Sequence, residues 1–87
     1  MNLELILDRL HEFGQRATYA AVGGLVRLPA ISVMHGRPKD KRHSWVVAKG
    51  NGLPTGYLTD EIDPRLATSP KPIVSADELA AWLRTHG

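Results

Sequence analysis

The 87-residue sequence contains no cysteine. Disulfide bonds, thiolate nucleophiles and cysteine-based zinc sites are therefore excluded. The sequence also lacks any apolar run near the 18 residues that a membrane helix needs, and its first residues do not form the basic segment of a signal peptide. We therefore expect a cytoplasmic protein that makes no contact with a membrane.

What is present is typical of one small folded domain. The length suits a single domain over residues 1–87, and the 43% hydrophobic and 23% charged residues are ordinary for a globular protein. Apolar residues from Leu3 to Phe13 recur at helical spacing, which predicts an amphipathic helix that begins after Asn2 and stops at Gly14. A second helix is predicted to begin near Thr18, a capping residue.

The middle of the second helix holds Gly23 and Gly24, each of which weakens a helix by about 1 kcal/mol relative to alanine. Such a pair makes sense where another helix crosses closely, although a frayed helix is the alternative. Pro29 then suits the first position of a short helix over residues 30–35 that stops at Gly36. Two short helices with a tight break predict a helix-turn-helix.

The next segments predict a β-hairpin and a last helix. Residues 44–48 resemble a strand, Asn51-Gly52 is a strong hairpin turn, and residues 53–58 form the return strand, which Pro54 confines to an edge. Ser75 opens a capping box for a helix within residues 72–87. The predicted fold class is therefore α+β: a single winged helix-turn-helix domain, with helix-turn-helix and wing over residues 14–57 and a capped C-terminal helix.

Charge is unevenly distributed along the chain. Between residues 14 and 57 the only acid is Asp40, against seven basic residues, whereas the other acids gather in the flanking segments. This segregation favours binding of phosphates, provided that the basic side chains converge on one surface without acids among them. The side chains expected to hold phosphates are Arg37, Lys39, Lys41, Arg42 and Lys49. The alternative interpretation is that the basic loop, residues 37–43, is only a solvated surface.

No pattern indicates catalysis. The sequence has no Ser-His-Asp spacing, phosphate-binding glycine loop or paired carboxylates, and its four histidines do not follow a metal-ligand pattern. We therefore expect no enzyme activity, metal or cofactor. Trp45 is expected to anchor the core, with stacking on a base as the alternative.

Several short motifs resemble a known family. Thr18-Tyr19-x-x-Val22, Leu28-Pro29, a short helix ending in Gly36, and Val46-Val47 before a glycine-containing turn are similar to the DNA-binding domain of alkylguanine-DNA alkyltransferases. They resemble still more the alkyltransferase-like proteins that lack the nucleophile. The resemblance covers residues 14–57 and implies a winged helix that binds the minor groove, flips an alkylated guanine and serves DNA repair. It also implies that Tyr19 contacts a backbone phosphate.

The sequence departs from this family at important positions. His43 stands where the family has its cysteine, so alkyl transfer is ruled out for want of a thiolate. Val33 stands where the family inserts an arginine finger, and an apolar wedge there could still unstack a base step. Ser32 and Val33 belong to the short helix expected to enter a groove, and His43 adjoins the basic loop, so all three are candidate DNA contacts.

The functional hypothesis is a non-enzymatic DNA-binding protein that senses alkylated or damaged DNA. The alternative is a protein-interaction or dimerisation module built on the same fold.

Overall fold

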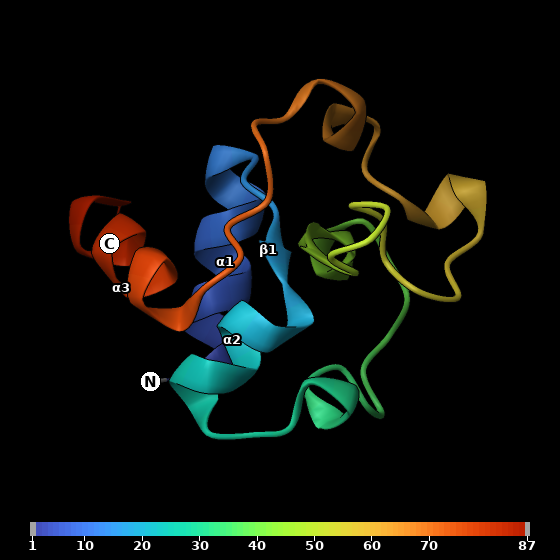
Figure 1. The fold of residues 1–87 in the computed structure, drawn as a ribbon. Coiled ribbons are helices and arrows are strands. Elements are labelled where there is room, and N and C mark those ends of the chain that lie inside the picture. The colour runs from blue at the N-terminus through green and yellow to red at the C-terminus, as the bar shows by residue number, and fades with distance from the viewer. Residues whose placement is uncertain (1, 87) are drawn as a thin grey trace.

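The computed structural model describes residues 2–86 and has a mixed α+β architecture (Figure 1). Over these residues it contains three α-helices, several 3-10 turns and a two-stranded parallel sheet. In chain order the elements are α1 (Leu3–Phe13), β1 (Ala17–Thr18), α2 (Tyr19–Val26), η1 (Ala30–Ser32), η2 (Arg42–Trp45), β2 (Val46–Val47), η3 (Thr59–Glu61), η4 (Pro64–Thr68) and α3 (Ala76–His86). No helix among them is long and apolar enough to cross a membrane.

Helix α1 forms as the sequence predicts. The Asn2 side chain accepts a hydrogen bond from the backbone N–H of Glu4 at 2.8 Å, and Gly14 ends the helix with a φ of 66°. The apolar face of α1 contributes Ile6 and Leu7 to the core, and both are fully buried. In Figure 1 this helix lies between α3 and β1.

The small sheet connects parts of the chain that are far apart in sequence. Ala17 pairs with Val46 and Thr18 with Val47 in parallel register. On its other side, Ala17 forms a parallel bridge with Ile73. Thr18 also begins α2, because its hydroxyl accepts the N–H of Ala21 at 3.1 Å. The second helix therefore starts where it was predicted.

The glycine pair of α2 marks a close approach of neighbouring segments. A Cβ on Gly23 would lie 2.6 Å from the backbone oxygen of Leu28, and a Cβ on Gly24 would lie 2.7 Å from the Cβ of Ala76 in α3. Both distances are shorter than real Cβ contacts. Of the two explanations considered for these glycines, close packing is therefore confirmed.

Helix α3 packs against α1 and α2 (Figure 1). Its predicted cap is present, since the Ser75 hydroxyl accepts the N–H of Glu78 at 3.1 Å. Leu79 and Leu83 bury the inner face of the helix. The capped C-terminal helix is thus confirmed.

The predicted return strand of the hairpin is wrong. The chain does turn after β2, with Ala48 N–H bonded to Leu53 O at 3.0 Å, but residues 53–58 form bends and turns rather than a strand. Gly56, with a φ of 78°, interrupts the extended backbone. The strand at Val46–Val47 pairs with β1 instead. The short helix expected over residues 30–35 is likewise a 3-10 turn, η1, followed by further turns.

Candidate nucleic-acid interface

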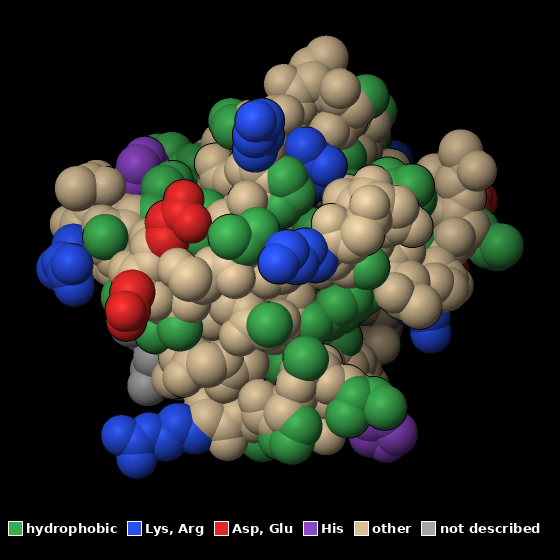
Figure 2. Space-filling model, in the orientation of Figure 1, with side chains coloured by type: hydrophobic (Ala, Val, Ile, Leu, Met, Phe, Trp, Pro, Cys, Tyr) green, Lys and Arg blue, Asp and Glu red, His purple; other side chains and the backbone are tan. Residues whose placement is uncertain are grey.

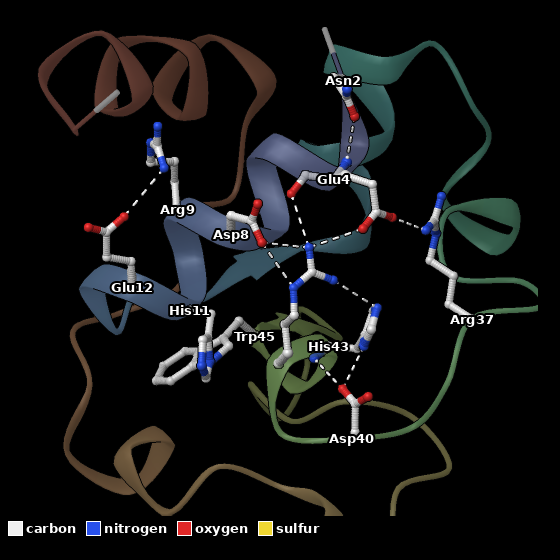
Figure 3. Close-up of polar contacts among 11 residues, drawn as sticks. Asn2, Glu4, Asp8, Arg9, His11, Glu12, Arg37, Asp40, His43 and Trp45 are labelled. Atoms are coloured by element: carbon white, nitrogen blue, oxygen red, sulfur yellow. Dashed lines mark hydrogen bonds and ion pairs between the residues drawn. The ribbon is translucent and has the colours of Figure 1, made fainter.

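Acidic side chains of α1 neutralise two of the predicted phosphate ligands (Figure 3). The Arg42 guanidinium contacts Asp8 Oδ1 at 2.6 Å and Glu4 Oε1 at 3.0 Å, and Arg37 also pairs with Glu4. The hydrogen bond to Asp8 raises the pKa of Arg42, and the bond to Glu4 adds to this effect against partial desolvation. The expectation that acids stay away from the basic cluster is therefore wrong for these two arginines.

His43 is not available to DNA, contrary to its place among the candidate contacts. The residue is 7% exposed, and its ring Nδ1 lies 2.5 Å from Asp40 Oδ1. Arg42 Nη1 faces the opposite ring nitrogen, Nε2, at 3.2 Å. Because a guanidinium can only donate, this arrangement fits the tautomer that carries its proton on Nδ1 and donates it to Asp40. His43 thus orders the basic loop internally.

Asp40 is the acceptor that holds the start of η2. Its carboxylate accepts both the ring and the backbone N–H of His43. Partial burial alone would raise the pKa of Asp40, but the hydrogen bonds from His43 and the charge of Arg42 outweigh it and lower this pKa. The carboxylate therefore stays ionised within the basic loop and offsets part of its positive charge.

Val33 cannot act as the wedge that the sequence suggested. It is 2% exposed and belongs to the hydrophobic core. By contrast Ile31, two residues earlier on η1, is 92% exposed. The apolar side chain that η1 presents to solvent is therefore Ile31.

The remaining candidates are exposed, but acids lie among them: Lys39 and Lys41 line one shallow groove with Arg42, and Asp40, Asp60 and Glu61 line it as well. Lys39, Lys41, Lys49 and Ser32 all lie in solvent. Lys41 lines an open groove that Asp60 also lines. In the view of Figure 2, Lys and Arg side chains are separated by uncharged surface, and acidic side chains lie over α3. The condition stated from the sequence, that the basic side chains share one surface without acids among them, is therefore not met.

A cavity of about 360 Å³ lies between the start of α2, η1 and residues 55–57. Its wall includes aromatic, apolar and cationic side chains, among them Tyr19, Tyr57, Ile31, Met34, Arg37 and Lys39. Three of these residues, Tyr19, Arg37 and Lys39, are sequence-predicted contacts that the fold brings together. The set is the strongest candidate for a binding site in the part of the chain that the structure describes.

Tyr19 is held in place by the loop that follows β2, and Tyr57 belongs to that loop. The Tyr19 hydroxyl accepts the backbone N–H of Thr55 at 2.9 Å, which ties the start of α2 to this loop. Burial raises the pKa of Tyr57 strongly, and the charges of Asp40 and Glu61 raise it further. The Tyr57 phenol is therefore protonated at neutral pH, so its hydroxyl is available as a hydrogen-bond donor.

Sequence reasoning missed Tyr57, Met34 and Ile31 as cavity residues. The only local signal was the pattern of residues 53–58, which predicts a strand rather than a loop that folds back towards α2. The bond from Thr55 to Tyr19 spans 36 positions, so no local pattern could reveal it.

Trp45 has the structural role that the sequence favoured. Its side chain is fully buried, and its indole N–H donates to His11 Nδ1 at 3.2 Å. The guanidinium of Arg65 lies 5.0 Å from the ring centroid, within the range of a cation–π contact. Stacking of Trp45 on a base is therefore excluded.

No family model, curated protein or solved structure matches the chain. Among residues 2–86, no group of three or more His, Asp or Glu side chains is placed to hold a metal ion.

Proposed function

We propose that this chain is a non-enzymatic DNA-binding protein whose contact surface centres on the tyrosine-lined cavity. The observation that carries the proposal is the convergence of Tyr19, Tyr57, Arg37 and Lys39 on this one site. Aromatic side chains stack on the flat faces of bases, and lysine or arginine neutralises phosphates. An anionic polymer that carries flat bases satisfies both kinds of group.

Lys39 is the cation most available to a phosphate. It is exposed and forms no ion pair with an acid among the described residues, whereas Arg37 is paired with Glu4. Met34 and Ile31 supply the apolar contact that a base needs on leaving water. The cavity lies at the lower end of the size range of ligand sites, which suits a single base rather than a large cofactor.

We extend the proposal to the fold, as a reduced winged helix, and to the kind of DNA that is bound, which carries an alkylated guanine. In this interpretation α2 and η1 are a shortened helix-turn-helix, and the loop over residues 49–57 takes the place of the wing. The resemblance to alkyltransferase-like proteins supports an alkylated guanine as the preferred base. The absence of cysteine supports recognition without alkyl transfer.

The test is fluorescence anisotropy with a short labelled duplex at several salt concentrations between 50 and 200 mM. We expect a salt-dependent affinity, and we expect Lys39→Ala to weaken binding and reduce the slope of log K against log salt by about 1. Lys71→Ala is the matched control, because this lysine is also exposed but does not line the cavity.

Failure to bind the duplex at 50 mM salt would reject the proposal. The same titration with a duplex containing O6-methylguanine separates DNA binding in general from recognition of the lesion. Tighter binding to the modified duplex supports lesion sensing, whereas equal affinity leaves DNA binding alone.

A protein-interaction module is the second candidate function, and one surface feature favours it. Trp82 and His86 stack at 4.4 Å between ring centroids, and the half-exposed Phe13 packs edge-on against both. This aromatic cluster joins α1 to α3, and none of its three residues lines the cavity. Sedimentation of the wild type and of Phe13→Ser over a range of concentrations tests whether the cluster supports self-association.

A further inference from the structure

The apolar residue most exposed to solvent lies at the rim of the candidate site. Ile31 is 92% exposed, more than any other large apolar residue among residues 2–86. It lies on η1 and lines the cavity together with Tyr19 and Lys39. Isoleucine is among the residues most often buried in proteins, so a fully exposed one at a candidate binding site suggests a partner that covers it.

The turn that carries Ile31 is held firmly on both sides. Ser32 N–H bonds to Pro29 O at 2.9 Å, and the next residue, Val33, is buried in the core. Gly23 of α2 leaves the space that this anchor needs, because a Cβ there would lie 3.1 Å from Val33 Cγ2. Ile31 therefore projects from a fixed support rather than from a flexible loop.

We propose that Ile31 is a wedge that inserts between adjacent base pairs of bound DNA. The inference rests on the proposed function and adds the residue that deforms the duplex. Proteins that unstack DNA commonly insert an isoleucine, leucine, phenylalanine or methionine between bases, while basic side chains hold the flanking phosphates. Ile31 beside Lys39, which forms no ion pair among the described residues, reproduces this combination of an apolar tip and nearby positive charge.

A protein partner is the competing occupant, since Leu28 nearby in the chain is also 44% exposed. The cation Lys39 at the cavity favours the nucleic acid, because it can hold a phosphate beside the wedge, whereas Arg37 is already paired with Glu4. The wedge also differs from the sequence-based expectation, which placed this role at Val33.

The experiment measures unstacking separately from affinity. A duplex with 2-aminopurine at its centre is saturated with protein, and its fluorescence is compared with that of the free duplex, since this base brightens when unstacked. We expect the wild-type protein to raise the fluorescence, because a wedge between two base pairs unstacks them. Ile31→Ala should abolish this rise and weaken binding by about tenfold, with an unchanged salt slope because no charge is lost.

Leu58→Ala is the control, because Leu58 is also highly exposed, at 67%, but does not line the cavity. It should leave both signals unchanged. Salt-dependent binding without a fluorescence rise, or a rise that survives Ile31→Ala, would overturn the wedge and leave the proposed function intact. Loss of self-association in Ile31→Ala with an unchanged fluorescence rise would also overturn it, and would assign the residue to a protein contact.

Discussion

The guanidinium of Arg42 binds the carboxylate of Asp8 through two of its nitrogens, Nη2 at 2.6 Å and Nε at 3.0 Å. This contact fastens the basic loop to α1 across 34 positions of the chain. A phosphate that approaches Arg42 must therefore compete with a carboxylate that is already in place. The acids of α1 reduce the charge that the loop can offer to DNA.

This relationship predicts that Asp8→Asn strengthens DNA binding. The substitution frees part of the positive charge of Arg42, so we expect affinity for a short duplex to rise about two- to fivefold at 50 mM salt and the salt slope to steepen by up to about 1. Anisotropy titrations at four salt concentrations measure both quantities.

Glu12→Gln is the matched control for this prediction. It removes the same charge from α1, but Glu12 pairs with Arg9 and not with the basic loop. If the two variants gain affinity equally, the effect is one of net charge, and the pairing of Arg42 with Asp8 has no specific role.

Local signals in the sequence were sufficient for the three α-helices, although not for the short helix predicted over residues 30–35. Asn2, Thr18 and Ser75 each accept the backbone N–H that their capping role predicts, and Gly14 ends α1 in the left-handed conformation. Caps and stops involve residues no more than a few positions apart, so their chemistry is visible in a short stretch of sequence.

The sheet could not be predicted in the same way. Val46 and Val47 do form a strand, but they pair with Ala17 and Thr18, 29 residues earlier, rather than with the residues after the Asn51-Gly52 turn. A turn signal shows where the chain can reverse, but not which strand is the partner. Ile73, which pairs with Ala17, gave no signal at all.

Only part of the candidate site could be predicted, because its contacts also join residues that are far apart in the sequence. Counting charges along the chain identified Arg37, Arg42 and Lys39, but not the α1 carboxylates that neutralise the first two. The segregation of charge in the sequence is undone by the fold, which places the acidic α1 against the basic loop. Lys39 keeps its predicted role because it lines the cavity instead.

Close packing of α2 against α3 predicts that Gly24→Ala destabilises the domain. Alanine in place of glycine would ordinarily stabilise a helix by about 1 kcal/mol. Here the added Cβ would meet the Cβ of Ala76 at 2.7 Å, so we expect a net loss of about 1–2 kcal/mol in the free energy of unfolding. Urea denaturation followed by circular dichroism measures this free energy of unfolding.

Two further variants test whether the contact with Ala76 causes the loss of stability. Ala76→Gly in the Gly24→Ala background removes the clash and should recover part of the loss. Gly50→Ala, where an added Cβ meets nothing within 4 Å, should change stability little. A stabilised Gly24→Ala protein would contradict the close approach of the two helices.

The two apolar residues of the η1 region should behave in opposite ways. Val33→Ala leaves a cavity in the core, so we expect a loss of about 1–3 kcal/mol in unfolding free energy. Ile31→Ala removes only exposed surface and should change stability by less than about 0.5 kcal/mol. Thermal and urea unfolding of both proteins measures this difference, and a large loss for Ile31→Ala would mean that its side chain is buried in solution.

Asp63 should make stability depend on pH in the acid range. Hydrogen bonds from Arg65 lower the pKa of this buried carboxyl group and outweigh the effect of desolvation. Since the folded pKa lies below the unfolded value of about 3.9, the unfolded chain takes up the proton first as pH falls. The stabilisation is therefore complete well above pH 4 and is lost as pH falls through the folded pKa.

Asp63→Asn removes this contribution, because the amide still caps η4 but carries no charge for Arg65. We expect the variant to be less stable than the wild type by about 1–2 kcal/mol at pH 7, with the difference shrinking as pH falls from about 5 to about 2. Urea unfolding at a series of pH values measures it, with Asp60→Asn, at an exposed position of η3, as the control. A difference of the same size at every pH would show that the Asp63 charge does not stabilise the fold. The structural role of Asp63 would then rest on two hydrogen bonds. Its carboxylate accepts the backbone N–H of Arg65, and its own backbone N–H donates to the Ser44 hydroxyl at 3.1 Å.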